Sequence, residues 1–229
     1  MRNEIKTSRG HWMIVCLLES SEVVKKLLFL AMFLVSHPVV SDQEFKQVTG
    51  IPEDVKSAKA IVPIYGQKLA FRLPTTWKGA FQDQKPHMFL MEFTPRNESI
   101  DSWQNLLTIQ GFENLSSRVA PERFLTDTGN RFKAICKNDF VFDNLGATTV
   151  DGFKAHRAIL GCSKVPGQNF GEVSYWLVIQ GSKDIYVVQK AVRFKSVNPL
   201  NSSNAHDFMA DISPIELCKA GGQQYECNK

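Results

Sequence analysis

The sequence predicts an α+β fold, a helix–sheet–helix sandwich around a mainly antiparallel sheet. Two observations predict it. The second half of the chain carries four strand-like runs in succession, which is typical of an antiparallel sheet. The last two runs, which meet at 181–183, are apolar on both faces, and such strands need one layer above them and one below.

Residues 1–41 predict an over-long N-terminus that ends in a secretory signal peptide. Lys25 and Lys26 stand before an apolar run at 27–35, and small residues up to Ser41 suit a cleavage site. As a helix this run covers about 14 Å, half of the ~30 Å apolar core of a bilayer, so we expect no stable membrane span. The alternative is a buried core helix. We expect translation to begin near Val23 or Val24, at an alternative start codon, and the product to be exported, either to the periplasm or to the extracellular medium.

After cleavage, we expect 42–58 to be a loose arm and 59–229 to be a single domain. The mature chain keeps 22 basic and 20 acidic residues, and it has no basic cluster of the kind that follows phosphates. We therefore expect no nucleic-acid partner. A mature length of 188 residues suits one domain with a sizeable core, which we expect to be a monomer.

Three strands are expected first. The runs AIVPIYG and KLAFRLP lie on either side of a tight turn at Gly66. Alternation in the second run places Leu69, Phe71 and Leu73 on one face. The run HMFLMEFTP at 87–95 predicts the third strand, apolar on both faces apart from one glutamate.

Two helices are expected next. In the segment 98–112, Ser99 can cap a helix whose apolar residues recur at helical spacing until Gly111 ends it. The second helix begins near Pro121, a residue favoured in the first turn, and continues to Cys136. Its apolar stripe consists of Phe124, Leu125, Thr128, Phe132 and Ile135.

The rest of the chain is expected to be strands and one short helix. The four strand runs are FVFDNLGATTV, FKAHRAILGC, GEVSYWLVIQ and KDIYVVQKAVRF. A hairpin turn at 181–183 joins the last two. A short helix near 204–212 can provide part of one covering layer.

Three segments carry a resemblance to a known fold. They are LAFRLPTTW (69–77), a strand that leads into Leu-Pro-x-x-Trp; MEFTPRNESIDSWQNLLTIQGF (91–112), a strand followed by a Trp-containing helix; and TTVDGFKAHRAILGC (148–162), a hairpin. Their order within residues 60–195 resembles the PsbP-like superfamily, which includes the extrinsic photosystem II subunit, Ran-binding Mog-type proteins and small exported bacterial proteins. The resemblance implies a PsbP-like sandwich that acts as a binding or assembly factor. It also implies an exported product of Gram-negative type, including type II secretion substrates. The photosystem metal and chloride functions do not carry over, since no matching motif is present.

The cysteines agree with export. Cleavage removes Cys16 and leaves four, an even number that favours two disulfides in an oxidising compartment, although three connectivities are open. We favour Cys136–Cys162, which would join the end of a helix to a strand, and Cys218–Cys227, which would close a short ring in the tail. Metal binding is the alternative, but no spacing resembles a paired CxxC site.

No catalytic, cofactor or metal site is predicted. His156 and Cys162 share one strand face, but six residues of strand separate them by ~20 Å, too far for a nucleophile and its base. We expect His156 to be a satisfied sheet residue, and His87 and His206 to lie at the surface. No GxSxG, HExxH or phosphate-binding loop occurs.

The function expected is that of an exported, non-enzymatic binding protein, with a protein or a small ligand as partner and an envelope or virulence role. Trp77, which follows Leu-Pro where a strand ends, and Phe81 in the next loop are the candidate contact residues. For Trp103 and Trp176 we favour core packing. The alternative function is that of a secreted hydrolase whose site is assembled from residues distant in sequence.

Overall fold

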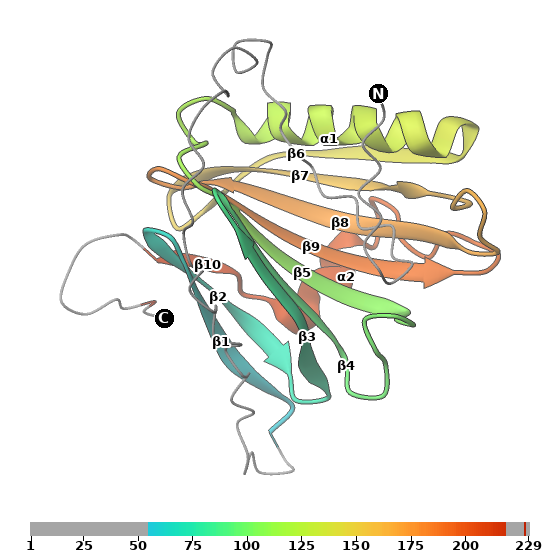
Figure 1. Ribbon diagram of the computed structural model, residues 1–229, viewed down its shortest axis with the longest axis horizontal. Coiled ribbons are helices and arrows are strands. Elements are labelled where there is room, and N and C mark those ends of the chain that lie inside the picture. The colour runs from blue at the N-terminus through green and yellow to red at the C-terminus, as the bar shows by residue number, and fades with distance from the viewer. Residues whose placement is uncertain (1–54, 219–226, 228–229) are drawn as a thin grey trace, which may run out of the picture. The chain divides into compact units, whose positions relative to one another are not determined.

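The computed structural model describes residues 55–218 and residue 227, which form two antiparallel sheets, two α-helices and two 3-10 turns (Figure 1). The larger sheet has seven strands, in the order β3 (Trp77–Lys85), β4 (Met88–Pro95), β5 (Asn105–Phe112), β9 (Ile185–Phe194), β8 (Gly171–Gln180), β7 (Phe153–Cys162) and β6 (Phe140–Val150). The smaller sheet has the order β1 (Ser57–Ile64), β2 (Gln67–Pro74) and β10 (Glu216–Cys218). The helices are α1 (Pro121–Cys136) and α2 (Ala205–Met209), and the 3-10 turns are η1 (Lys137–Asp139) and η2 (Ala210–Ile212). The α+β class and the mainly antiparallel sheet are as predicted.

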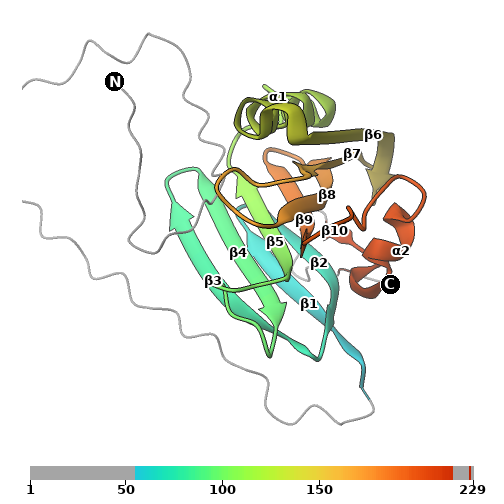
Figure 2. The same ribbon diagram turned by 90° about the vertical axis from the view of Figure 1, so that its right-hand side faces the viewer.

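The larger sheet is covered on both faces (Figure 2). Helix α1 packs on the β6–β7–β8 end of one face, where the rings of Phe132 and Trp176 meet edge to face at 6.1 Å. The other face packs against the smaller sheet, and the main apolar core lies between the two sheets. The second layer therefore differs from the expected helical one: the amphipathic β1–β2 hairpin provides most of it, and α2 covers only the part beside β8 and β9.

The predicted helix at 98–112 is wrong in its second half, because residues 105–112 form strand β5. This strand lies between β4 and β9 and is antiparallel to both, and residues on both of its faces are buried. Its apolar residues Leu106 and Leu107 continue the helical spacing of Ile100 and Trp103, so spacing alone does not separate a strand from a helix here. The first half is a loop in which Trp103 packs against Leu106 and Ala191.

The loop expected after Trp77 is also a strand. Residues 77–85 form β3, which pairs with β4 and has a bulge between Gly79 and Phe81. Trp77 belongs to the core and is 8% exposed, so the exposed position expected for it is wrong. Leu-Pro at the end of β2 turns the chain inward here, toward the core between the sheets. Phe81 is half-buried on this edge strand.

The other elements agree with prediction to within a few residues. The β1–β2 hairpin turns at Tyr65 and Gly66, although β1 begins at Ser57, inside the expected arm. Four members of the predicted stripe of α1 are buried, whereas Ile135 is 38% exposed. The leader predicted at 1–41 lies outside the described residues. Among the helices described, none combines the length and the apolar character that a bilayer crossing needs.

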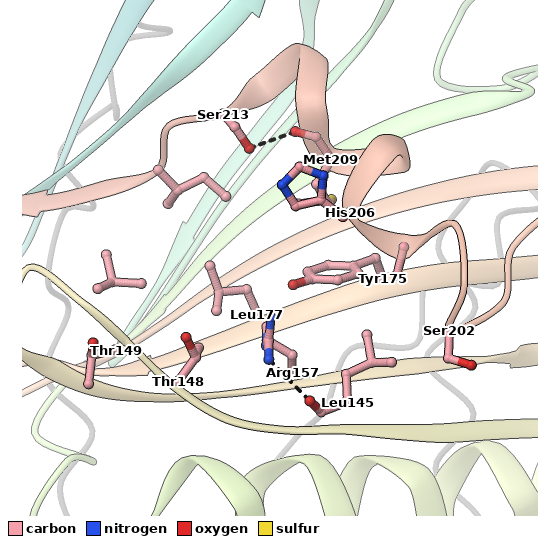
Figure 3. A pocket seen from close by; sticks show the side chains of 13 residues that line it. Leu145, Thr148, Thr149, Arg157, Tyr175, Leu177, Ser202, His206, Met209 and Ser213 are labelled. Carbon is pink, nitrogen blue, oxygen red and sulfur yellow. Dashed lines mark hydrogen bonds between the residues drawn. The ribbon is translucent and has the colours of Figure 1, made fainter.

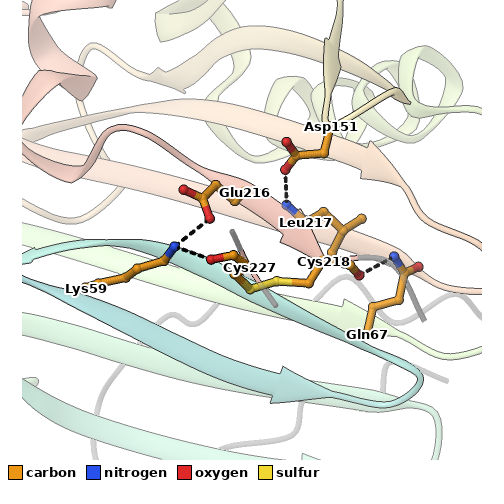
Figure 4. The surroundings of a disulfide bond; sticks show 7 residues. All are labelled: Lys59, Gln67, Asp151, Glu216, Leu217, Cys218 and Cys227. Atoms are coloured by element: carbon orange, nitrogen blue, oxygen red, sulfur yellow. Dashed lines mark hydrogen bonds and ion pairs between the residues drawn. A yellow bond between two sulfur atoms is a disulfide. The ribbon is translucent and has the colours of Figure 1, made fainter. Parts of the chain in front are cut away.

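Both favoured disulfides are present. Cys136–Cys162 joins the end of α1 to the end of β7, and Cys218–Cys227 joins β10 to the C-terminal tail. Around the second bond, Lys59 Nζ donates to Glu216 Oε2 at 2.7 Å and to the Cys227 carbonyl at 2.8 Å (Figure 4). Besides its pairing with β2, three side-chain contacts hold β10 in place: Lys59 with Glu216, Gln67 Nε2 donating to the Cys218 carbonyl at 3.0 Å, and Leu217 N donating to Asp151 Oδ2. Asp151 lies in the turn between β6 and β7, so this bond ties the smaller sheet to the larger one.

Candidate functional site: a pocket beneath α2

A pocket of about 390 Å³ lies between the larger sheet and the segment that contains α2 (Figure 3). Its floor comes from β6, β7 and β8, and its roof from residues 202–215. The lining residues are Leu145, Thr148, Thr149, Val150, Arg157, Tyr175, Leu177, Ser202, Ala205, His206, Met209, Ser213 and Ile215. Exposed residues at the rim, among them Ser202 and His206, leave the pocket open to solvent. A volume of this size falls within the usual range for small-molecule sites.

Strand alternation places the polar groups of the floor. On β7, Arg157 shares the core-facing side with Ala155 and Ile159, and on β8 Tyr175 shares it with Leu177. Arg157 lies opposite Leu177 in the β7–β8 register, so Tyr175 is its diagonal neighbour. A guanidinium and a phenol therefore meet in an otherwise apolar part of the sheet.

Arg157 is the charged group of the floor. Its Nη2 donates to the Leu145 carbonyl at 3.2 Å, whereas its Nε is shielded from solvent and has no hydrogen-bond partner. No ion pair involves Arg157 among the residues that the structure describes. Arginine stays charged in proteins, so this site holds a permanent positive charge.

Tyr175 is only 7% exposed, and burial raises the pKa of its phenol above the ordinary value. The charge of Arg157 and a hydrogen bond from it act in the opposite direction but do not cancel the effect of burial. Tyr175 is consequently neutral at physiological pH, and its hydroxyl can donate a hydrogen bond.

A buried lysine anchors the roof. Lys190 on β9, opposite Tyr175, donates to Asp211 Oδ1 and to the Phe208 carbonyl, both at 2.6 Å. Its Nζ also lies 4.6 Å from the centre of the Phe208 ring. Ser213 Oγ donates to the Met209 carbonyl at 2.8 Å and so stabilises the turn that follows η2. These bonds fix the α2 segment over the sheet.

The pocket lining contains no carboxylate and no thiol. The hydroxyl of Ser213 is bonded to backbone, and within the described part of the chain no hydrogen bond joins His206 to a serine. His206 instead extends into solvent with its side chain 97% exposed, 3.6 Å from its neighbour Asp207. The described residues also contain no group of three His, Cys, Asp or Glu side chains able to hold a metal ion.

A second hollow of about 280 Å³ lies at the end of β9. Here the Arg193 guanidinium stacks 3.7 Å from the centre of the Trp103 ring and 4.8 Å from that of Phe170. Its Nε donates to Glu172 Oε2 at 3.2 Å. In contrast to Arg157, this arginine has a carboxylate partner.

The structure does not gather the residues singled out from the sequence into one site. The four cysteines are paired, and Trp77 is buried in the core away from the pocket lining. His156 is buried and its Nε2 is 2.7 Å from Asn144 Oδ1, as expected of a satisfied sheet residue. His87 and His206 are at the surface, and Trp103 and Trp176 are in the core, as predicted.

Sequence reasoning missed Arg157 and Tyr175. The available signal was the alternation of side chains along a strand. In the run FKAHRAILGC, Arg157 lies on the same face as Ala155 and Ile159, which are apolar. A charged residue within the buried face of a strand is uncommon and indicates a partner or a site.

The fold and the pocket define an α+β domain with one small-molecule-sized hollow between its larger sheet and a short helical segment. No family model matches the chain, and no curated protein matches it.

Solved structures with some likeness exist. The chain is similar to the Saccharomyces cerevisiae Ran-binding protein Mog1p (12% identity, covering 66% of this chain and 84% of that chain, TM-score 0.40). It is similar to PsbP of Synechocystis (14% identity, 63% and 86% covered, TM-score 0.38). It is similar to LpqN of Mycobacterium tuberculosis, described as involved in cell envelope biogenesis (15% identity, 72% and 92% covered, TM-score 0.35). Two of the three are a Mog-type and a PsbP-type protein, the groups to which a resemblance was expected from the sequence.

Proposed function

We propose that this protein is an exported, non-enzymatic binding protein and that the pocket beneath α2 holds a small ligand. The observation that carries the proposal is the solvent-open pocket of about 390 Å³, whose floor places a guanidinium and a phenol beside leucine and valine side chains. Apolar side chains make up about half of the lining, and the guanidinium, hydroxyl and imidazole groups of the other residues can orient a bound small molecule.

The composition of the pocket favours binding over catalysis. Nucleophilic catalysis needs a nucleophile hydrogen-bonded to a base, and the pocket hydroxyls and His206 have no such contact among the described residues. General acid–base catalysis by carboxylates would need an Asp or Glu in the lining, which contains none. The secreted hydrolase remains the rival function, and activity assays on ester, peptide and glycoside substrates separate the two.

The binding proposal is tested by a fragment screen observed through NMR. With ¹³C-labelled methionine methyl groups, ligands in the pocket should shift the signal of Met209, whereas Met88 and Met91 on β4 serve as internal controls. Substitution Ser202→Trp at the exposed rim should weaken the same ligands, and Ser182→Trp, exposed in the β8–β9 turn, should not. If no fragment moves the Met209 signal, or if both variants bind alike, the proposal fails.

Export is supported by the two disulfides, because such bonds persist in oxidising compartments. We propose cleavage after Ser41. N-terminal sequencing of the native product should give Asp42 as the first residue. A product that keeps the leader, or that carries four free thiols, would contradict export.

The proposed contact surface at Trp77 and Phe81 stays a prediction, now limited to the half-buried edge-strand residue Phe81.

A further inference from the structure

The charge of Arg157 determines what the pocket can hold. A half-buried cation is costly unless a negative group or several hydrogen bonds satisfy it. Arg157 has one carbonyl, one phenol and a shielded Nε without a partner. Lys190 and Arg193 on β9 are each matched by a carboxylate, Asp211 and Glu172 respectively.

Among the residues that the structure describes, no carboxylate completes the pair. The pocket lining has no Asp or Glu, and the carboxylate of Asp211 in the roof segment is already bonded to Lys190. The groups that face the floor around Arg157 are donors or can act as donors: the Tyr175 phenol and the Thr148 hydroxyl. A donor set with one fixed positive charge is complementary to a single anionic group with two acceptor oxygens.

The remaining lining residues determine the chemical character of the rest of the ligand. Beyond Arg157, the exposed His206 and the residues with hydroxyl groups, the lining consists of apolar side chains: Leu145, Val150, Leu177, Ala205, Met209 and Ile215. Burial of an apolar chain or ring there would contribute about 25 cal/mol of binding free energy for each Å² of apolar surface removed from water. We infer that the pocket binds a small organic carboxylate, with its carboxylate on the Arg157 guanidinium and the Tyr175 hydroxyl and its apolar body under α2. This inference rests on the proposed binding function and names the ligand class.

One arginine favours a carboxylate over a phosphate monoester. A phosphate monoester carries close to two negative charges at neutral pH, whereas the lining provides one permanent cation and the solvent-exposed His206. The planar guanidinium of Arg157 can donate two hydrogen bonds to a carboxylate or to a phosphate, so the experiment also includes a phosphate probe.

The inference is tested with three probes of matched apolar body: hexanoate, hexanamide and pentyl phosphate. Titration followed at the Met209 methyl should give hexanoate binding at least about tenfold tighter than hexanamide, since a charge-assisted hydrogen bond contributes about 1.5–3 kcal/mol. Pentyl phosphate should bind more weakly than hexanoate. In Arg157→Gln the preference for hexanoate over hexanamide should disappear, and Arg157→Lys should recover part of it. Arg123→Gln, which removes an equal charge from the exposed face of α1, should leave the preference unchanged.

The outcomes separate the two proposals. If hexanamide binds as tightly as hexanoate, the pocket is a binding site but the carboxylate inference falls. If pentyl phosphate binds most tightly, the anion is a phosphate and the inference also falls. If no probe or fragment reaches the Met209 signal, the binding function itself fails. Should Arg157→Gln not fold, as judged by its melting curve, the hexanoate-to-hexanamide ratio of the wild-type protein and its partial loss in Arg157→Lys, which keeps the charge, decide the question.

Discussion

The ionisable side chains of the larger sheet differ in how well neighbouring groups satisfy their charges. Among the acidic ones, Glu172 has a partner that satisfies its charge only in part. It lies on β8 beside the Arg193 guanidinium, to which its Oε2 is bonded at 3.2 Å. Burial raises the pKa of the Glu172 carboxyl above its ordinary value, and the charge and hydrogen bond of Arg193 only partly oppose that effect. The folded protein consequently binds this proton more tightly than the unfolded chain does.

The sign of the pH dependence follows from that difference. A carboxyl with a raised pKa contributes stability that is fully present below its unfolded pKa and is lost as the pH rises through the folded pKa. We predict that wild-type protein loses stability relative to Glu172→Gln as the pH rises from about 4.5 upward. Melting temperatures of both proteins measured between pH 4 and pH 8 check this. The exposed substitution Glu122→Gln on α1 is the control, and wild-type protein should not lose stability relative to this variant over the same pH range. A constant difference between wild-type protein and Glu172→Gln would contradict the prediction.

The α2 segment depends on one residue of the sheet below it. Two helical turns this short are not stable alone, so tertiary contacts must hold them. Lys190 makes those contacts through Asp211 and the Phe208 carbonyl, and it lies on the face of β9 that α2 covers. Because the same segment forms the roof of the pocket, its order and ligand binding are coupled.

We predict that Lys190→Met destabilises the protein by about 1–3 kcal/mol, since Met keeps the stem but loses two charge-assisted hydrogen bonds and leaves the Phe208 carbonyl unsatisfied. Amide hydrogen exchange should accelerate in residues 205–213 more than in β5 or β8. Lys154→Met on β7 is the control, because Lys154 is exposed and the same charge is removed. Equal exchange in 205–213 for both variants would show that Lys190 does not anchor the roof.

At the same scale, the elements show what the sequence could and could not predict. Strands with clear turns at both ends, such as β6, β7 and β8, were predicted to the residue, and so was α1. Strand β5 was not, because the spacing of its apolar residues fits a helix as well as a central strand, and only pairing with β4 and β9 decides between them. Strand β3 was missed for the opposite reason. Residues 78–85 have little alternation, and pairing with β4 rather than local preference makes them a strand.

The pocket was beyond prediction because it depends on contacts between elements far apart in the chain. The alternation of side chains along β7 is enough to place Arg157 on a buried face of the strand. The path of the chain after β9 decides that residues 202–215 cover this face, and the local sequence does not show that path. Both disulfides, in contrast, were predictable, since each joins cysteines at the ends of recognisable segments.

For the whole molecule, the two disulfides restrict the unfolded chain to different degrees. Cys136 and Cys162 are 26 residues apart, and Cys218 and Cys227 are 9 apart. In the loop-entropy account, the longer loop stabilises the fold by about 3.5 kcal/mol and the shorter one by about 1 kcal/mol less. The longer loop contains η1, β6 and β7, and its bond keeps the end of α1 on the sheet.

We therefore predict that the double variant Cys136→Ala/Cys162→Ala loses more free energy of unfolding than Cys218→Ala/Cys227→Ala, with the difference near the ~1 kcal/mol set by loop length. Urea unfolding without reductant, followed by tryptophan fluorescence, measures both, because Trp176 lies against α1 and Trp77 lies in the core between the sheets. Wild-type protein in excess reductant, which lacks both bonds, serves as the control and should lose more free energy of unfolding than either double variant. If Cys218→Ala/Cys227→Ala lost as much free energy of unfolding as Cys136→Ala/Cys162→Ala, loop length would not account for the shorter disulfide. That disulfide would then also hold β10, and with it the smaller sheet, in place.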